Sequence, residues 1–320
     1  MAHDELLADL LRHPDAPRIR TSKLKGDIAA LVVDASGLGP DERAALEERL
    51  KAAALAIPGV AQVRVALTVS RPERKVVAVG SGKGGVGKST LAANLAVALV
   101  RLGKRVGMID ADIYGPSQPT LLGAHERPLA EKQKLIPVEA HGVRLLSIGQ
   151  LVPAGQALAW RGPMAGSALT QLIEGEWGDT EIILVDLPPG TGDVQLSLVQ
   201  KMLPDGAVIV STPQDLSLID ATRAIDLFGK TGVPVLGIIE NMAGYQCPHC
   251  GETSDPFGSG GAEAAAKELG IAFLGRLPLS ASLRAASDRG TPPAAGEGAA
   301  ADAFAALAQK LLDALDTLRR

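Results

Sequence analysis

The chain has 320 residues, 36 acidic and 32 basic side chains, a net charge of -4 and 46% hydrophobic residues. This apolar content supports a folded body, and the length suits one large and one small domain, so an intrinsically disordered chain is excluded. The apolar stretches are shorter than the roughly 20 residues that cross a bilayer. The sequence has no long basic tract of the kind that binds nucleic acid. We therefore expect neither a membrane nor nucleic acid among the partners.

The first residues, Met1 to Glu5, carry acidic groups where a secretory signal would carry positive charge. Two cysteines three positions apart cannot cross-link a chain of this length, so they indicate metal or redox chemistry in a reducing compartment. We expect a cytoplasmic protein.

Residues 1–70 are predicted to form a small α+β domain. Residues 5–13 and 41–57 have helical spacing, whereas residues 28–33 and 63–69 have the apolar pattern of strands. The polar segment 71–75, which contains a proline, is interpreted as a linker.

Residues 76–320 have the pattern of a large α/β domain. Short apolar strands alternate with longer helical segments, which is typical of a mostly parallel sheet with helices on both faces. The strands are expected at residues 76–79, 105–110, 182–186, 207–212 and 235–240. A final helix is expected at residues 304–318, and residues 292–296 with the alanines after them are interpreted as a plain surface loop.

The first of these strands leads into Gly82-Lys83-Gly84-Gly85-Val86-Gly87-Lys88-Ser89-Thr90, and a helix over residues 91–100 follows. This is the phosphate-binding loop in its strand–loop–helix context. The glycines let backbone N–H groups converge on phosphate oxygens, Lys88 meets the β- and γ-phosphates, and the Ser89 hydroxyl ligates Mg²⁺. The sequence therefore predicts a nucleotide site with Mg²⁺.

Lys83 is an extra lysine near the start of this loop, and it resembles the signature lysine of the deviant Walker A class. In that class, the resemblance implies, the lysine crosses a dimer interface and touches the nucleotide of the other subunit. A second cation beside the phosphates would stabilise charge that develops during phosphoryl transfer. Dimerisation would then gate hydrolysis; a solvated loop lysine is the alternative.

Two acidic strand ends complete the predicted site. Asp186 follows four apolar residues, the Walker B pattern, and is expected to hold the water shell of Mg²⁺. Asp110 is expected to support the metal and Asp112 to orient the attacking water, with a capping or turn role as the alternative for either residue. Gly190 follows two prolines and is expected to offer its N–H to the γ-phosphate.

Cys247 and Cys250 form a C-x-x-C pair after the strand at residues 235–240. Two thiolates can face one metal centre, but a tetrahedral Zn²⁺ site and a [4Fe–4S] cluster each require four ligands. A two-fold dimer would bring the same pair from each subunit together and fill the site. From the spacing alone, an iron–sulfur cluster and Zn²⁺ are equally open.

Together these features resemble the Mrp/ApbC group of P-loop ATPases, which are iron–sulfur cluster carriers related to the MinD and ParA ATPases. The resemblance covers about residues 75–295 and rests on residues 82–90, 110–117, 160–164, 186–193, 212–214, 241–242 and 247–250. It implies a homodimeric ATPase that holds a labile [4Fe–4S] cluster at its interface through Cys247 and Cys250 and passes it to apoproteins. It also implies recognition of the adenine of ATP by Asn241.

Residues 1–70 resemble the MIP18-like domain of this family in size and order of elements, although they contain no cysteine. Two other functions fit the motifs less well. A MinD/ParA-type positioning ATPase needs a basic amphipathic terminal helix or a basic surface, whereas residues 305–320 carry three cations against two acids. A zinc-bridged nucleotide switch without a cluster is the other hypothesis.

Overall fold

The structure is a computed structural model that describes residues 10–36, 38–68, 74–151, 162–247 and 249–318. The chain divides into two compact units, Met1–Pro72 and Glu73–Arg320. In the described part of the chain, no helix has both the length and the apolar character needed to cross a bilayer.

The first unit is a three-stranded sheet with one long helix. Its elements in chain order are η1 (Leu10–Arg12), η2 (Ala16–Arg18), β1 (Ile19–Lys25), β2 (Ile28–Asp34), α2 (Pro40–Leu55) and β3 (Gln62–Thr68). The strand order is β1-β2-β3, with β1 antiparallel to β2 and β2 parallel to β3, so α2 makes the crossover between parallel strands.

The core of this unit lies between α2 and one face of the sheet. Leu46 and Leu50, which share one face of the helix, are fully buried with Leu31 and Val33 of β2. The predicted helix at 41–57 and the strands at 28–33 and 63–69 agree with these elements. The strand β1, rich in lysine and arginine, was not predicted, and most of the expected helix at 5–13 lies outside the described residues.

The second unit is built on an eight-stranded sheet of order β15-β12-β11-β4-β10-β5-β9-β8, in which only β8 runs antiparallel to its neighbour. The strands are β4 (Lys75–Gly80), β5 (Val106–Asp110), β8 (Val138–Ala140), β9 (Val143–Ser147), β10 (Ile182–Asp186), β11 (Gly206–Ser211), β12 (Val235–Glu240) and β15 (Phe273–Arg276). Two hairpins stand apart from it: β6 (Leu129–Glu131) with β7 (Lys134–Ile136), and β13 (Tyr245–Gln246) with β14 (Thr253–Ser254).

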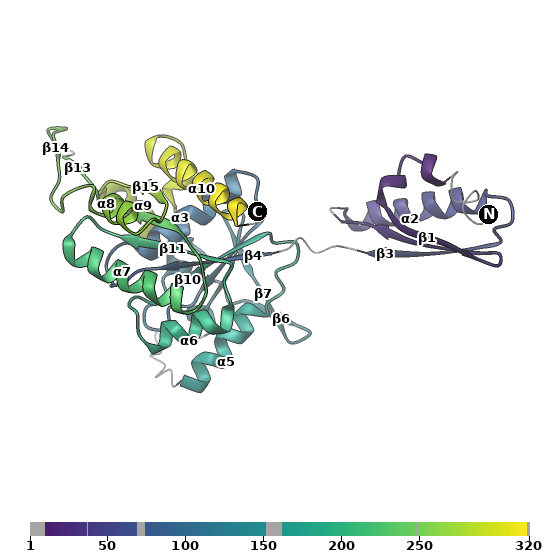
Figure 1. The fold of residues 1–320 in the computed structure, drawn as a ribbon, viewed down its shortest axis with the longest axis horizontal. Coiled ribbons are helices and arrows are strands. Elements are labelled where there is room, and N and C mark those ends of the chain that lie inside the picture. The colour runs from purple at the N-terminus through teal and green to yellow at the C-terminus, as the bar shows by residue number, and fades with distance from the viewer. Residues whose placement is uncertain (1–9, 37, 69–73, 152–161, 248, 319–320) are drawn as a thin grey trace. The chain divides into compact units, whose positions relative to one another are not determined.

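Helices cover both faces of the large sheet (Figure 1). On one face lie α3 (Lys88–Arg101) and α10 (Ala299–Thr317), and on the other α5 (Gly162–Ile173), α6 (Asp193–Met202), α7 (Asp215–Lys230) and α8 (Gly261–Glu268). The remaining short elements are α4 (Gln118–Leu121), α9 (Ala281–Asp288), η3 (Ile148–Leu151) and η4 (Pro293–Ala295).

The strands contribute to two separate cores because successive side chains point to opposite faces. On β4, Val77 and Val79 pack with α3 and α10, whereas Ala78 between them packs with the helices of the other face. All three side chains are fully buried. Coverage of both faces explains the uninterrupted apolar strands in the sequence, and the predicted α/β fold is confirmed.

The structure corrects two of the sequence expectations, and a third lies partly outside the described residues. The loop assigned to residues 292–296 and the alanines after it is wrong: Ala294 is fully buried, its N–H donates to Asn94 Oδ1 at 3.0 Å, and α10 begins at Ala299. Alanine is the strongest helix former, which favours this earlier start. Lys75 begins β4, so the linker predicted at 71–75 ends earlier. Of the segment 160–164, residues 160 and 161 lie outside the described residues, and Gly162 begins α5.

Candidate functional site

The polar residues singled out in the sequence meet at one edge of the large sheet. The strands β12, β11, β4, β10 and β5 are neighbours, all parallel, and their carboxyl ends lie together. Asp110 and Asp186 are the last residues of β5 and β10, the phosphate-binding loop follows β4, and Asn241 follows β12. This is the edge where parallel α/β sheets bind ligands.

Two glycines of the phosphate-binding loop are required by close contacts. A Cβ on Gly82 would lie 2.1 Å from backbone atoms of Asp220 in α7. Gly87, directly before α3, has a φ of +80°, and a Cβ there would lie 2.3 Å from Asn241 Nδ2. The loop thus packs against α7 on one side and against the residue after β12 on the other.

The loop encloses a cavity of about 220 Å³ at the N-terminus of α3. Its lining consists of Ser81, residues 83–90, Asp112 and Pro189. Free N–H groups at a helix N-terminus and the helix dipole favour an anion here. All the loop residues predicted to cradle phosphate, apart from Gly82, therefore line one cavity.

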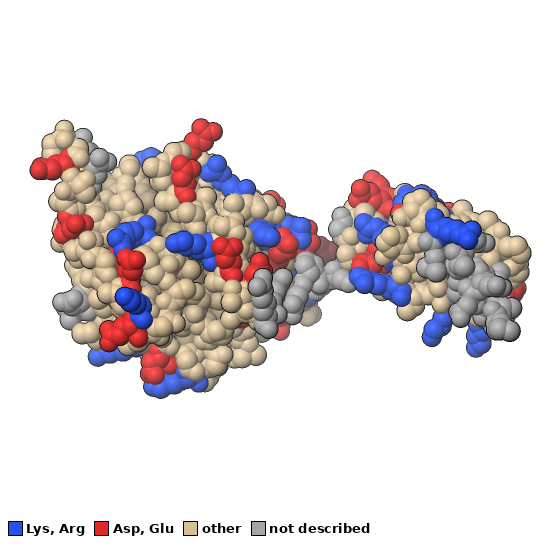
Figure 2. Space-filling view, turned by 45° about the horizontal axis from the view of Figure 1, so that its top comes forward, with Lys and Arg blue, Asp and Glu red and all other residues tan. Residues whose placement is uncertain are grey.

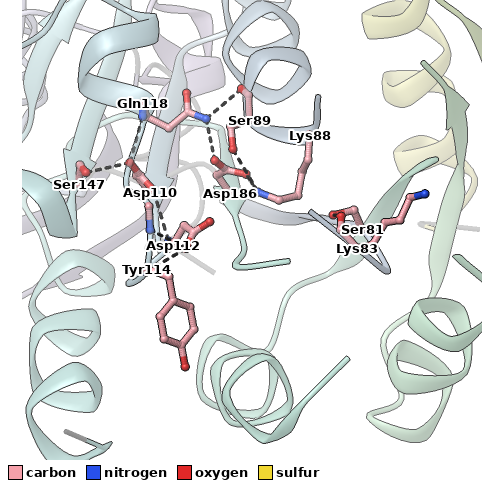
Figure 3. A network of polar contacts seen from close by, with 11 residues as sticks. Ser81, Lys83, Lys88, Ser89, Asp110, Asp112, Tyr114, Gln118, Ser147 and Asp186 are labelled. Atoms are coloured by element: carbon pink, nitrogen blue, oxygen red, sulfur yellow. Dashed lines mark hydrogen bonds and ion pairs between the residues drawn. The ribbon is translucent and has the colours of Figure 1, made fainter. Parts of the chain in front are cut away.

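Lys88 and Asp186 form a buried ion pair between α3 and β10. The side chain of Lys88 is 6% exposed and that of Asp186 is fully buried. The Lys88 ammonium donates to Asp186 Oδ1 and, at 3.2 Å, to Ser89 Oγ (Figure 3). Bound phosphate would have to draw this ammonium away from the carboxylate.

Asp110 lies beside Asp186 at the end of the neighbouring strand and is fully buried. Its carboxylate accepts hydrogen bonds from the Gln118 N–H at 3.0 Å, the Ser147 hydroxyl at 2.9 Å and the Asp112 N–H at 3.3 Å. Burial, and then repulsion from the Asp186 carboxylate, raise the pKa of Asp110 to about 7. A cation between the two carboxylates would relieve this repulsion.

Asp112 has the turn role that its sequence position left open, and it also lies at the cavity, whereas its role toward the attacking water stays a prediction. It lines the cavity of the phosphate-binding loop and is 7% exposed. Its Oδ1 also accepts hydrogen bonds from the N–H groups of Tyr114 and Gly115, at 3.0 and 3.2 Å, which closes a turn. The turn orients the carboxylate within the cavity.

Gly190 does not present its N–H to the cavity in this structure. The N–H donates to the Ser81 carbonyl at 3.0 Å, and the residue has a φ of +99°. The expected contact with a γ-phosphate therefore requires this bond to open. That contact stays a prediction.

The oxygen atoms at this edge fit Mg²⁺, which prefers carboxylates, hydroxyls and water. Ser89, Asp110 and Asp186 supply the expected hydroxyl and carboxylates. Gln118, at the start of α4, connects them, since its Nε2 donates to Asp186 Oδ2 at 2.8 Å and to the Ser89 carbonyl at 3.0 Å. No local sequence pattern indicates Gln118, because its contacts depend on how α4 folds back over the sheet edge.

Lys83 is placed differently from Lys88. Figure 3 shows its side chain directed away from Lys88 and Asp186. Among the described residues, no hydrogen bond or ion pair engages its ammonium. It lines a second cavity, of about 140 Å³, together with Thr212, Gln214, Met242 and Phe257.

A larger cavity of about 410 Å³ adjoins the loop on the side of α9. Gly87 and Thr90 of the loop, Asn241, Met242, Tyr245 and residues 278–281, 283 and 284 line it. Asn241 Nδ2 donates to the Val86 carbonyl at 2.8 Å, which fixes the amide beside the loop. The size and the mostly apolar wall suit a flat aromatic base.

The cysteine pair lies at the tip of the β13–β14 hairpin. Tyr245 pairs with Ser254, Gln246 with Thr253, and the Cys247 N–H donates to the Glu252 carbonyl at 2.9 Å. Both thiols are free, and Cys250 is exposed. Backbone N–H groups of Cys250 and His249, and then the Cys250 thiol, lower the pKa of Cys247, which favours the thiolate that binds metals.

One chain supplies too few ligands for a complete metal site at this tip. Within the described ranges, no group of three or more His, Cys, Asp or Glu side chains could hold a metal ion. That the pair is half of a site completed by a second subunit stays a prediction. The hairpin strand that leads to Cys247 begins at Tyr245, which also lines the larger cavity.

Known proteins are similar to this chain in sequence. Residues 73–312 match the family described as "ParA: NUBPL iron-transfer P-loop NTPase". A protein of Deinococcus radiodurans named "Iron-sulfur cluster carrier protein" is 47% identical over 307 residues, which cover 92% of this chain and 87% of the relative.

Two solved structures are similar as well. A nucleotide-binding protein from Archaeoglobus fulgidus, in complex with ADP, is 40% identical, with a TM-score of 0.60 over 68% of this chain and 86% of that one. The septum site-determining protein MinD from Pyrococcus horikoshii, complexed with Mg-ADP, is 25% identical, with a TM-score of 0.57 over 74% of this chain and 96% of that one.

Proposed function

The chain belongs to the family of NUBPL iron-transfer P-loop NTPases, and from this premise we propose that it is an ATP-dependent carrier of iron–sulfur clusters. It binds ATP with Mg²⁺, holds a labile [4Fe–4S] cluster as cargo between the two subunits of a homodimer, and delivers it to apoproteins in the cytoplasm. The observation that carries this proposal is the free Cys247–Cys250 pair on a hairpin whose first residue lines the cavity beside the phosphate-binding loop.

Different residues of the phosphate-binding loop bind different parts of ATP. N–H groups of the loop and of the α3 N-terminus surround the phosphates, and Lys88 exchanges Asp186 for the β- and γ-phosphates. Ser89, Asp110 and Asp186 would hold Mg²⁺, which would supply positive charge that neutralises the phosphates. Asn241 and the larger cavity receive the adenine.

Hydrolysis then depends on groups at the rim of the loop. Asp112, held in its turn, orients the attacking water toward the γ-phosphate. Gly190 leaves the Ser81 carbonyl and donates its N–H to the γ-phosphate. Lys83, whose side chain is directed away from Lys88 and Asp186, reaches the nucleotide of the second subunit and makes hydrolysis depend on dimerisation.

The cluster is held weakly enough to leave because each chain supplies only two thiolates. Two-fold symmetry brings the pairs of both subunits together and completes four ligands. A change in the dimer during ATP turnover then opens the site and releases the cluster. ParA-like binding to DNA has no support on the face that Figure 2 shows, where basic and acidic side chains are interspersed over the second unit.

Anaerobic reconstitution with ⁵⁷Fe and sulfide tests the proposal. We expect the wild-type protein to give the Mössbauer spectrum of a [4Fe–4S] cluster. Cys247→Ala should lose the cluster, because a ligand is removed. It should keep its affinity for a fluorescent ATP analogue within about twofold, since Cys247 does not line the cavity of the phosphate-binding loop. Ser254→Ala, an exposed change on the same hairpin, is the matched control and should retain the cluster.

Two results would contradict the proposal. The first is a cluster that persists unchanged in the Cys247→Ala, Cys250→Ala double variant. The second is a wild-type protein that binds stoichiometric zinc tightly and forms no cluster. The second result would support a zinc-bridged nucleotide switch instead.

A further inference from the structure

Gln118 contacts all three residues that are proposed to hold Mg²⁺. Its backbone N–H donates to Asp110 Oδ2 at 3.0 Å, and its Nε2 donates to Asp186 Oδ2 at 2.8 Å and to the carbonyl of Ser89 at 3.0 Å (Figure 3). No other described side chain contacts both Asp186 and Ser89 except Lys88. The residue is fully buried.

The orientation of the Gln118 amide is fixed by its partners. Asp186 Oδ2 and the Ser89 carbonyl are both acceptors, so the nitrogen must face them and the oxygen must face away. The oxygen, Oε1, then has no hydrogen-bond partner in the described structure. Buried polar atoms are nearly always paired, so this arrangement is not the one that folding alone would favour. An apolar side chain of similar length would avoid the unpaired oxygen.

The two oxygens of Asp186 have separate partners. Lys88 holds Oδ1, and Gln118 holds Oδ2. When Lys88 moves to the phosphates of ATP, Gln118 is the donor that remains on this carboxylate among the described residues. Oδ1 is then free to face the metal while Oδ2 keeps the side chain in place.

We propose that Gln118 is a positioning residue for Mg²⁺: it holds Asp186, Asp110 and the start of α3 in the arrangement that receives the metal with its nucleotide. This inference rests on the proposed function, because it concerns the metal of that same nucleotide site. Groups that orient metal ligands typically contribute 10–100-fold to metal affinity. Gln118 lines neither the cavity assigned to the phosphates nor the one assigned to the base, so its effect should be confined to the metal.

A Mg²⁺ titration of nucleotide binding tests this role. Affinity for a fluorescent ATP analogue is measured at increasing Mg²⁺, and Mn²⁺ binding to the nucleotide complex is followed in parallel by electron paramagnetic resonance. For Gln118→Met we expect about a tenfold higher Mg²⁺ concentration at half-maximal tightening and a matching loss of Mn²⁺ affinity. Affinity for the analogue without metal should stay within about twofold, because the phosphate contacts are intact.

Gln195→Met is the matched control. Gln195 lies on α6, is 2% exposed and has no hydrogen-bond partner for either side-chain polar atom in the described structure. Gln195 makes no hydrogen bond to Asp110, Asp186 or Ser89 in the described structure, so this change should leave the Mg²⁺ titration unchanged. Gln118→Glu, which keeps the shape but places an acceptor against Asp186, should shift the titration as Gln118→Met does, and it serves if the methionine variant does not fold.

The outcomes separate this role from the proposed function. Equal Mg²⁺ titrations for the wild type, for Gln195→Met and for a folded Gln118 variant would overturn the role of Gln118 and leave nucleotide binding standing. A wild-type protein whose nucleotide affinity does not respond to Mg²⁺ would contradict the proposed nucleotide site itself, and the role of Gln118 with it.

Discussion

At the scale of single residues, the ion pair of Lys88 with Asp186 sets the starting state of the site. Both side chains are buried, so neither charge can lose its partner without a large desolvation cost. ATP with Mg²⁺ offers each group a replacement partner at the same time, phosphate for Lys88 and the metal for Asp186. We therefore expect ATP and Mg²⁺ to bind by replacing the contact between Lys88 and Asp186, and not by adding charge to an empty cavity.

The two lysines of the loop should be separable by mutation. Lys83→Ala should keep ATP affinity within about twofold, because its side chain is directed away from Lys88 and Asp186, and should lower turnover about 10³-fold, the contribution of a cation supplied across an interface. Lys88→Ala should instead abolish ATP binding. Equilibrium binding of a fluorescent analogue and steady-state phosphate release measure the two effects.

Lys132→Ala, a change of an exposed lysine in the β6–β7 turn, is the control and should behave as wild type. Unaltered phosphate release in Lys83→Ala would rule out a cross-subunit role for this lysine.

The residues that could be predicted are those whose chemistry follows from local sequence. The loop glycines, Lys88, Ser89 and Asp186 stand in one continuous motif or at the end of an apolar strand, and the structure brings them together at one edge. Gln118 could not be predicted, because only the folded sheet brings α4 against both Ser89 and Asp186. The hydrogen bond of Gly190 to Ser81 was also beyond the sequence, since it depends on a loop conformation rather than on residue type.

At the scale of elements, α7 and the phosphate-binding loop determine each other's position. The backbone of Asp220 in α7 lies where a Cβ on Gly82 would be, with 2.1 Å between them. The loop can therefore keep its path only if this position has no side chain, or if α7 moves outward.

Gly82→Ala should consequently destabilise the second unit and weaken ATP binding. We expect a loss of roughly 1–3 kcal/mol in the free energy of unfolding, the usual cost of an extra methyl group in a tightly packed contact. Gly192→Ala is the control, because a Cβ there meets nothing within 4 Å and the φ of -84° suits any residue. Urea denaturation followed by circular dichroism measures both, and equal stabilities for the two variants would contradict the close packing of α7.

Elements with a strong periodic pattern could be predicted, and those set by tertiary contacts could not. The strands β10 and β12 have the predicted bounds because both faces are covered and neither strand has a polar side chain before its last residue. The edge strand β15 and the short helix α4 have only four residues each, too few for a periodic signal. The start of α10 was missed because a buried contact of η4 with Asn94 precedes it, which no local pattern indicates.

At the scale of the whole molecule, our proposal gives the chain one ATP site and half of a metal site. The P-loop cavities and the Cys247–Cys250 hairpin belong to one compact unit, residues 73–320, which is also the part that matches the iron-transfer family. The first unit has a separate core and, as expected from the sequence, no cysteine. Its likeness to a MIP18-like domain stays a prediction.

The central claim is that two copies of the chain complete a single cluster site under the control of ATP. Native mass spectrometry of the anaerobically reconstituted protein, with a non-hydrolysable ATP analogue and Mg²⁺, tests this claim most directly because the mass gives chains, metal and sulfide together. We predict one species with two chains, two nucleotides and one [4Fe–4S] cluster. A cluster carried stably by a single chain, or a dimer whose only added metal is zinc, would contradict the account.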